Sequence, residues 1–257
     1  MRGVDFGHTA ADYATHRAGF PDSFFDLLEQ HVMLIQGTRA VDLGTGTGSV
    51  ARTLALRGAA SVIGVDPSEA LTSQARGLDE AADVQVGYVH TTAESTGLPS
   101  ESFDLVIAAQ CWWWFEAQAA AMEAHRLLAP GGNLVIASLD WLPLPGSAPE
   151  ATEQLIRQAN PGWTLYGGSG RHPGWLNVLK HGGFSNVRSF EYDIDIPYTH
   201  EAWRGRMRAS AGIGATLAPD QVAAFDRTHA GMLAERFPDD PLPVPHRIYA
   251  AIGRRTE

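Results

Sequence analysis

The chain has 257 residues, a length at which an α/β fold buries a sizeable core and often forms one domain. Its formal net charge of -10 provides no broad basic surface for nucleic-acid phosphates or an anionic membrane. No apolar run reaches the ~20 residues that span a bilayer, and the N-terminus lacks the apolar core of a signal peptide. We therefore expect a cytoplasmic protein with a small-molecule substrate and with neither a nucleic-acid nor a membrane partner.

Cys111 is the single cysteine, so the chain cannot form an internal disulfide. A lone thiol without a ligand cluster beside it gives no indication of a metal or redox site. We expect no bound metal, and we interpret Cys111 as a small buried apolar residue.

Short runs of β-branched and aliphatic residues alternate with longer stretches of helical spacing, which is typical of βαβ units. The runs predict strands over residues 39–43, 61–65, 84–89, 103–109, 133–139, 187–196 and 247–252. The helical stretches are residues 21–34, 49–57, 68–77, 117–128, 150–159 and 173–182. Ser68 stands at a capping position, and the cluster 129–132 is interpreted as a turn that breaks the preceding helix.

These elements predict a Rossmann-like α/β fold, a seven-stranded and mostly parallel sheet with helices on both faces and a helical cap. We predict a single domain over residues 1–257, with a cap helix in 1–37 and a sheet core in 38–198 and 241–257. Residues 199–240 are predicted to form a helical insertion, because their spacing is more than a plain strand connection needs.

A glycine-rich loop follows the first predicted strand, in the run Asp42-Leu43-Gly44-Thr45-Gly46-Thr47-Gly48. Glycines let a loop turn tightly and let a ligand touch the backbone, while the next helix offers free N–H groups. Asp66 ends the second predicted strand, where a carboxylate can accept hydrogen bonds from both hydroxyls of a ribose. The loop and Asp66 together predict a ligand that contains adenosine.

Two kinds of adenosine cofactor fit this pattern. Residues 46–51, Gly-Thr-Gly-Ser-Val-Ala, match the G-x-G-x-x-A form of the dinucleotide fingerprint. Asp42 opposes that reading, because a carboxylate at the end of the first strand would repel a pyrophosphate but could bind an ammonium through the loop or water. We favour S-adenosylmethionine, which carries an amino-acid ammonium and no phosphate.

Five segments in order resemble the class I methyltransferase family, in its small-molecule branch of ubiquinone and menaquinone methyltransferase type. They are the loop 42–48, Val65-Asp66-Pro67-Ser68, Thr92-Ala93-Glu94 with Leu98-Pro99, Phe103-Asp104-Leu105-Val106, and Leu127-Leu128-Ala129-Pro130-Gly131-Gly132. The resemblance implies S-adenosylmethionine as cofactor and methyl transfer as activity. It implies far less about the substrate.

The resemblance also implies which residues bind the cofactor. The loop glycines would face the methionine and ribose, Asp66 the ribose hydroxyls, Ala93 and Glu94 the adenine edge, and Gln110 the methionine portion. An aromatic residue and an arginine ahead of the first strand would complete the site. The cofactor-binding residues predicted in this way are Tyr13, Arg17, Asp42, Gly44, Thr45, Gly46, Gly48, Asp66, Pro67, Ala93, Glu94 and Gln110.

An aromatic run, Trp112-Trp113-Trp114-Phe115, follows the fourth predicted strand at the sheet edge where such folds bind ligands. Many relatives read aromatic-His-Trp-Phe here, so Trp113 stands in place of a candidate base. Successive aromatics cannot all point one way, and packing in the core is the alternative for each. We predict substrate contacts for Trp112, Trp114, Trp141, Tyr166 and Trp203, although core packing is the simpler reading of Trp203.

Methyl transfer needs a positioned nucleophile and, for oxygen or carbon acceptors, removal of a proton. The predicted bases or orienting groups are Asp140, His172 and His200. Asp140 follows the fifth predicted strand, where sites form, though a loop-capping aspartate would look the same. A structural role is the alternative for each histidine. The three arginines after Trp203 are interpreted as a solvated helix face, with contact of one of them to a substrate carboxylate as the alternative.

The sequence therefore predicts a methyltransferase that uses S-adenosylmethionine to methylate an oxygen, nitrogen or carbon atom of a small, aromatic or amphiphilic metabolite. The alternatives are an NAD(P)-dependent oxidoreductase and a non-catalytic protein that binds S-adenosylmethionine. A homodimer is left open as the assembly.

Overall fold

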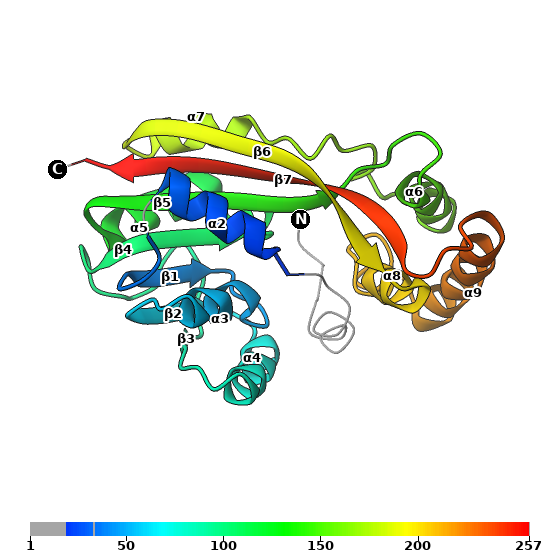
Figure 1. The fold of residues 1–257 in the computed structure, drawn as a ribbon, viewed down its shortest axis with the longest axis horizontal. Helices are drawn as coiled ribbons and strands as arrows, with labels where there is room; N and C mark the ends of the chain where they lie inside the picture. The colour runs from blue at the N-terminus through cyan, green and yellow to red at the C-terminus, as the bar shows by residue number, and fades with distance from the viewer. Residues whose placement is uncertain (1–18, 33, 257) are drawn as a thin grey trace. The chain divides into compact units, whose positions relative to one another are not determined.

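The computed structural model describes residues 19–32 and 34–256, so the predicted cofactor residues Tyr13 and Arg17 lie outside the described residues. Its strands form one sheet in the order β3-β2-β1-β4-β5-β7-β6. The strands are β1 Arg39–Leu43, β2 Ser61–Val65, β3 Gly87–Val89, β4 Phe103–Ala109, β5 Leu128–Trp141, β6 Phe184–Tyr198 and β7 Leu242–Arg255. The pairs β1–β2, β1–β4, β2–β3 and β4–β5 are parallel, whereas β7 runs against β5 and β6 (Figure 1). The predicted seven-stranded, mostly parallel sheet is confirmed.

The described residues form two compact units. The core unit contains residues 19–138, 172–191 and 249–256, and the accessory unit contains residues 139–171 and 192–248. Strands β5, β6 and β7 each begin in one unit and end in the other. The single domain over the whole chain stays a prediction.

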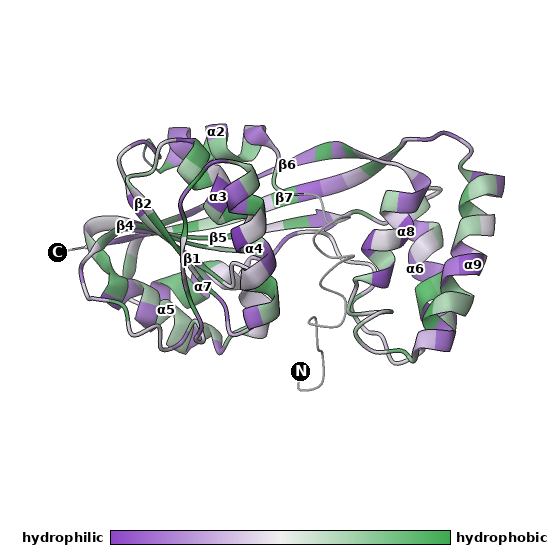
Figure 2. Cartoon of the chain, turned by 90° about the horizontal axis from the view of Figure 1, so that it is seen from below, coloured by the Kyte–Doolittle hydropathy of each residue, from purple (hydrophilic) through white to green (hydrophobic). Residues whose placement is uncertain are grey.

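Helices cover both faces of the sheet in the core unit, with α2 and α3 on one face and α5 and α7 on the other (Figures 1 and 2). The helices are α2 Asp22–His31, α3 Ser49–Leu56, α4 Glu69–Ala81, α5 Ala117–Leu127 and α7 Gly174–His181, with the short 3₁₀ helix η2 at Trp112–Trp114. Strands β1, β2 and β4 are largely hydrophobic in Figure 2, whereas the helices mix hydrophobic and hydrophilic residues. This is the pattern of parallel strands buried under amphipathic helices.

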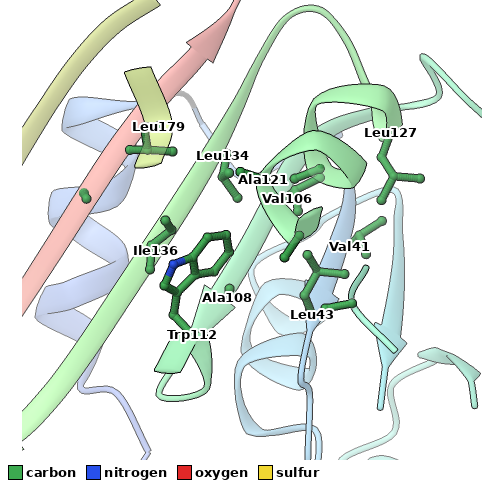
Figure 3. Packing of buried hydrophobic residues seen from close by; sticks show 14 of the residues in the cluster. Val41, Leu43, Val106, Ala108, Trp112, Ala121, Leu127, Leu134, Ile136 and Leu179 are labelled. Carbon is green, nitrogen blue, oxygen red and sulfur yellow. The ribbon is translucent and has the colours of Figure 1, made fainter. Parts of the chain in front are cut away.

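The hydrophobic core of this unit lies around β1, β4 and β5. Leu43, Val106, Leu134 and Ile136 are fully buried, and Trp112 packs among them at 2% exposure (Figure 3). Ser68 caps α4 by accepting the N–H of Leu71, as predicted. The rigid sheet thus holds the loop after β1 and the aromatic run after β4 at the same edge.

The prediction of a turn at residues 129–132 is wrong. The segment is not a turn, because α5 ends at Leu127 and β5 begins at Leu128. Gly131 has φ +83°, and the register of β5 against β4 shifts between Phe103 and Leu105. The glycines therefore lie in an irregular first part of β5. A Cβ at Gly132 would lie 3.0 Å from the carbonyl oxygen of Asp104, so this position has no room for a side chain.

Three helices build the described part of the accessory unit: α6 Ala148–Ala159, α8 His200–Arg208 and α9 Pro219–Arg236. A turn around Ile213, in the loop before α9, contributes to its core. Trp203 is fully buried there and donates from Nε1 to Thr152 Oγ1 over 3.0 Å. Arg204 and Arg208 form ion pairs with Asp226 of α9. The predicted solvated face is therefore wrong for these two arginines, because α9 packs against α8 and brings Asp226 to them.

No helix in the described part of the chain is long and apolar enough to cross a membrane. Among the same residues, no cluster of three or more histidine, cysteine, aspartate or glutamate side chains could hold a metal ion.

Gly253→Ala is expected to lower the free energy of unfolding by about 1–3 kcal/mol, because overpacking a well-packed strand forces its neighbours to move. A Cβ at this position of β7 would lie 2.7 Å from the Cβ of Phe184. Gly77→Ala is the matched control, since Gly77 lies in α4 with nothing within 4 Å of an added Cβ. The control should stabilise by about 0.5–1 kcal/mol, and chemical denaturation that ranks the two variants in the opposite order would contradict this packing.

Candidate functional site

The loop between β1 and α3 has a backbone that only glycine adopts readily. Gly44, Gly46 and Gly48 have φ of +67°, +56° and +74°. The N–H groups of Gly44 and Thr45 both donate to the carbonyl oxygen of Val65, at 2.8 and 3.0 Å. A Cβ on Gly44 would lie 2.8 Å from the Cys111 side chain. The loop is therefore pinned against the ends of β2 and β4, with its backbone close to the sheet edge.

Asp66, at the end of β2, is bonded to the loop. It is 8% exposed, and its Oδ2 accepts the N–H of Gly46 while its Oδ1 accepts the N–H of Ser68, both at 2.9 Å. Burial raises the pKa of Asp66, and the two backbone bonds favour its charged form. Each carboxylate oxygen retains a further lone pair, so the group can also accept from hydroxyls of a ligand.

Asp42 is a second buried carboxylate in the same place. It is 3% exposed and accepts a 2.7 Å hydrogen bond from Thr45 Oγ1. Burial raises the pKa of Asp42 to about 7, and repulsion from Asp66 adds to the rise. An anionic ligand would be repelled here, whereas a nearby cation would favour the charged form of Asp42. The donor and acceptor set thus fits an adenosyl amino acid with an ammonium group.

Helix α5 holds the predicted adenine segment. Ala93 is buried, and Glu94 Oε1 accepts the N–H of Glu116, the N-cap residue of α5, at 2.9 Å. Thr96 donates to Glu123 Oε1 from its N–H at 2.8 Å and from its hydroxyl at 2.5 Å. The Arg126 guanidinium and these bonds lower the pKa of Glu123 to about 2. The segment is therefore fixed at both ends by one helix.

Gln110 and Cys111 connect β4 to the aromatic run. Gln110 has φ +61°, and its N–H donates to the carbonyl oxygen of Ala137 at 2.9 Å. Cys111 is buried, as predicted, and its Sγ donates to the carbonyl oxygen of Leu43 at 3.1 Å. In the 3₁₀ helix η2 successive side chains point about 120° apart. Trp112 therefore enters the core (Figure 3), where it offers no exposed face to a substrate, while Trp114 is half-buried.

His172 lies in an aromatic cluster of the core unit. Its ring stacks on Trp175 with centroids 4.3 Å apart and an interplanar angle of 9°. Trp113 and Tyr249 stand 6.1 and 6.0 Å from the same ring. Nothing in the sequence indicated this cluster, because Trp113 of η2 and Tyr249 of β7 lie far along the chain from His172 and no motif links them.

The remaining predicted residues lie in the accessory unit. Asp140 and Trp141 form the end of β5, and Trp141 Nε1 donates to Glu153 Oε1 at 2.8 Å, with the Arg206 guanidinium 5.1 Å from its ring centroid. Tyr166 is 46% exposed under the guanidinium of Arg157.

His200 and Trp203 have structural contacts in that unit. His200 Nε2 donates to the carbonyl oxygens of Phe237 and Asp239 at 2.8 and 3.0 Å, which ties α8 to the loop after α9. Trp203 is in the core of the unit. The structure therefore brings together Asp42, the loop glycines and Asp66, with Ala93 and Gln110 in the same unit, whereas Asp140 and His200 belong to the other unit. The site assignments stay predictions.

The methyltransferase domain family model matches residues 41–136, the stretch that carries β1 to most of β5 and the glycine loop. An uncharacterized methyltransferase of Mycobacterium tuberculosis is 34% identical over 131 residues, 51% of this chain and 50% of that protein. A demethylmenaquinone methyltransferase of Thermus thermophilus is 36% identical over 112 residues, 43% of this chain and 50% of that protein. The chain thus spans about half the length of the curated relatives it matches.

A solved structure shares the fold over nearly the whole chain. It is phosphoethanolamine N-methyltransferase 2 of Haemonchus contortus in complex with phosphomonomethylethanolamine and S-adenosylhomocysteine. The TM-score is 0.61 at 18% identity, covering 99% of this chain and 61% of that one. The fold is shared with this methyltransferase. Residues 41–136 are similar to the methyltransferase domain family, and the resemblance that the motifs indicated is confirmed over that stretch.

Asp42→Asn is expected to gain stability relative to the natural protein as the pH rises from 5 to 8, measured without ligand. Because folding raises the pKa of Asp42 from 3.8 to about 7, the folded state holds an extra proton between these values. The free energy of unfolding of the natural protein then falls as the pH rises through that window, by roughly 1–3 kcal/mol. Asparagine has no such proton and can still accept from Thr45.

Thermal melting at several pH values measures the difference. Asp83→Asn is the control, since Asp83 is exposed at φ +53°, a backbone conformation that asparagine also accepts. A melting difference between Asp42→Asn and the natural protein that stays constant with pH would show that the buried carboxylate does not titrate in this range.

Proposed function

We propose that the protein binds S-adenosylmethionine at the glycine loop and Asp66 and transfers its methyl group to an oxygen, nitrogen or carbon atom of a small, aromatic or amphiphilic metabolite. The observation that carries the proposal is that two buried carboxylates, Asp42 and Asp66, both contact the loop of positive-φ glycines. The family match over residues 41–136 supports it, as does the S-adenosylhomocysteine bound in the Haemonchus contortus enzyme.

The residues divide the binding task. The bare backbone at Gly44, Gly46 and Gly48 admits a ligand close to the sheet edge, with Thr45 beside it. Asp66 accepts from the ribose hydroxyls, next to Pro67 at the start of α4. Asp42 balances the ammonium charge through the loop or water.

The adenine end and the methionine end take further residues. Ala93 and Glu94 line the adenine edge, and Gln110 lies at the methionine portion. When bound, the cofactor supplies a methyl group already activated on a sulfonium.

Proton removal is the task of the catalytic candidates Asp140, His172 and His200. His172 has the strongest support, because Trp113, Trp175 and Tyr249 pack around its partly buried ring in the unit that carries the glycine loop. The bonds of His200 Nε2 to two carbonyl oxygens favour a structural role for it. An amine acceptor would need only positioning, whereas an oxygen or carbon acceptor would use the base.

The acceptor is proposed from composition and from aromatic residues. The net charge of -10 favours a small molecule over a nucleic acid, and it agrees with a cytoplasmic enzyme. Trp114, Trp141 and Tyr166 are partly exposed and remain the proposed substrate contacts, whereas Trp112 and Trp203 are core residues. Assays with labelled S-adenosylmethionine across metabolite classes test the acceptor, and turnover on protein or RNA alone would overturn this part of the proposal.

Calorimetric titration with S-adenosylhomocysteine and with NAD tests the cofactor. We expect micromolar binding of the former and none of the latter, because a pyrophosphate would face the carboxylate of Asp42. Asp66→Asn should weaken S-adenosylhomocysteine binding by about 10–100-fold, since hydrogen bonds to a charged acceptor are worth roughly 1.5–3 kcal/mol. Asp83→Asn, exposed and away from the loop, should bind as the natural protein does.

The opposite result has a clear meaning. NAD binding without S-adenosylhomocysteine binding would identify a dinucleotide oxidoreductase instead. Tight S-adenosylhomocysteine binding without methylation of any acceptor tested in a single turnover would favour a non-catalytic binding protein.

A further inference from the structure

Three side chains from three elements converge beside the glycine loop, and Tyr88 lies on the same face of the sheet as Asp42, since Gly64 is the register partner of both. Tyr88 of β3 donates from its hydroxyl to Asp79 Oδ2 of α4 at 2.6 Å. Arg52 Nε of α3 lies 2.9 Å from Asp79 Oδ1, an ion pair that is off the direction of a hydrogen bond. Arg52 Nη2 donates to the carbonyl oxygen of Thr47 at 2.8 Å. We refer to Arg52, Asp79 and Tyr88 as the loop clamp.

The loop clamp acts on one peptide plane. The carbonyl of Thr47 accepts from Arg52, and the N–H of Gly48, which belongs to the same peptide group, donates to the carbonyl oxygen of Thr45 at 2.9 Å. A rigid peptide held at its oxygen on one side and its N–H on the other cannot rotate without breaking a bond. The orientation of the Thr47–Gly48 peptide is therefore set by Arg52 and the loop together.

Tyr88 also limits what can stand at Gly48. A Cβ on Gly48 would lie 2.4 Å from the Tyr88 hydroxyl oxygen and 3.4 Å from Arg52 Nη2. The same tyrosine ring would lie 2.8 Å from a Cβ on Gly64 of β2. The tyrosine thus occupies the space that two glycines leave, and its hydroxyl lies against the loop at Gly48.

Because Asp79 is buried, the loop clamp depends on specific polar contacts among its three side chains. Asp79 is 4% exposed, so its carboxylate depends on Tyr88 and Arg52 to replace water. Burial and the Asp79 carboxylate raise the pKa of Tyr88, which keeps its hydroxyl protonated as a donor throughout the ordinary pH range. Arginine suits the shared position because its planar fork can reach Asp79 and Thr47 at once, which a lysine ammonium on a flexible stem does not do.

We propose that Arg52, Asp79 and Tyr88 are positioning residues that hold the Thr47–Gly48 peptide, and with it the Gly46 N–H on Asp66, in the conformation that binds the cofactor. This inference rests on the proposed function, since it names residues that act on the same site without touching the ligand. The loop clamp places its three members on α3, α4 and β3, so the packing of these elements is coupled to cofactor affinity.

Titration with S-adenosylhomocysteine tests the loop clamp. Tyr88→Phe and Arg52→Lys should each raise the Kd about 3–10-fold, the effect of one hydrogen bond. The double variant should raise it by less than the product of the two, because both act through Asp79. Kd values within twofold of the natural protein for both single variants would overturn the proposal.

Arg39→Lys is the matched control. Arg39 binds both oxygens of Asp104 at 3.0 and 2.8 Å, at the opposite end of β1 from the loop. The control also replaces an arginine that pairs with an aspartate, so a Kd that rises as much as in Arg52→Lys would show a general effect of stability and overturn the proposal.

Amide hydrogen exchange of residues 44–49 gives a readout that needs no ligand. Exchange there should be about 3–10-fold faster in Tyr88→Phe than in Arg39→Lys, because the opening free energy of the loop alone is lowered. Equal exchange would overturn the loop clamp. Failure of the natural protein to bind S-adenosylhomocysteine would instead refute the proposed function, and the two failures are thus distinguishable.

Discussion

The carboxylate of Asp66 is the contact on which the rest of the candidate site depends. It ends β2, bonds the N–H of Gly46 in the loop after β1 and bonds the N–H of Ser68 at the start of α4. Three segments that diverge in sequence are joined at one nearly buried charge. A buried charge is costly unless it is hydrogen-bonded, so moving either backbone N–H away from the carboxylate would cost free energy. The carboxylate therefore holds both segments in place.

A second buried carboxylate beside the first is electrostatically unfavourable without a ligand. Burial and the proximity of Asp66 raise the pKa of Asp42 to about 7. Two such groups on one loop favour a ligand that brings hydroxyl donors and a positive charge, and disfavour one that brings phosphates. The electrostatics therefore distinguish between two cofactors that the glycine spacing alone admits.

Polar contacts around the site support it. Arg52 and Tyr88, joined through Asp79, lie against the loop at Thr47 and Gly48, and Glu123 with Arg126 fixes the segment after β3. Apart from Tyr88 of β3, these charged groups stand on helices that otherwise pack apolar residues on the sheet. The polar contacts set the position of loops that hydrophobic packing, which is not directional, would leave undefined.

The sequence by itself determined the central strands of the sheet and the candidate ligand-binding edge. Strands 39–43, 61–65 and 103–109 were predicted to the residue, because buried parallel strands are continuous apolar runs bounded by turn residues. The glycine loop and Asp66 were identified for a related reason. Glycines without side chains and one carboxylate at a strand end form a local pattern that indicates the kind of ligand. Tertiary structure decided the rest.

It turned Trp112 into the core, bonded His200 to carbonyl groups across the accessory unit, and paired Arg204 and Arg208 with Asp226. It also brought Tyr88 against Gly48, and Trp113 and Tyr249 to the ring of His172. In each case the partner comes from a different element, and the direction of a side chain depends on how two elements pack. No periodicity or spacing within one segment carries that information.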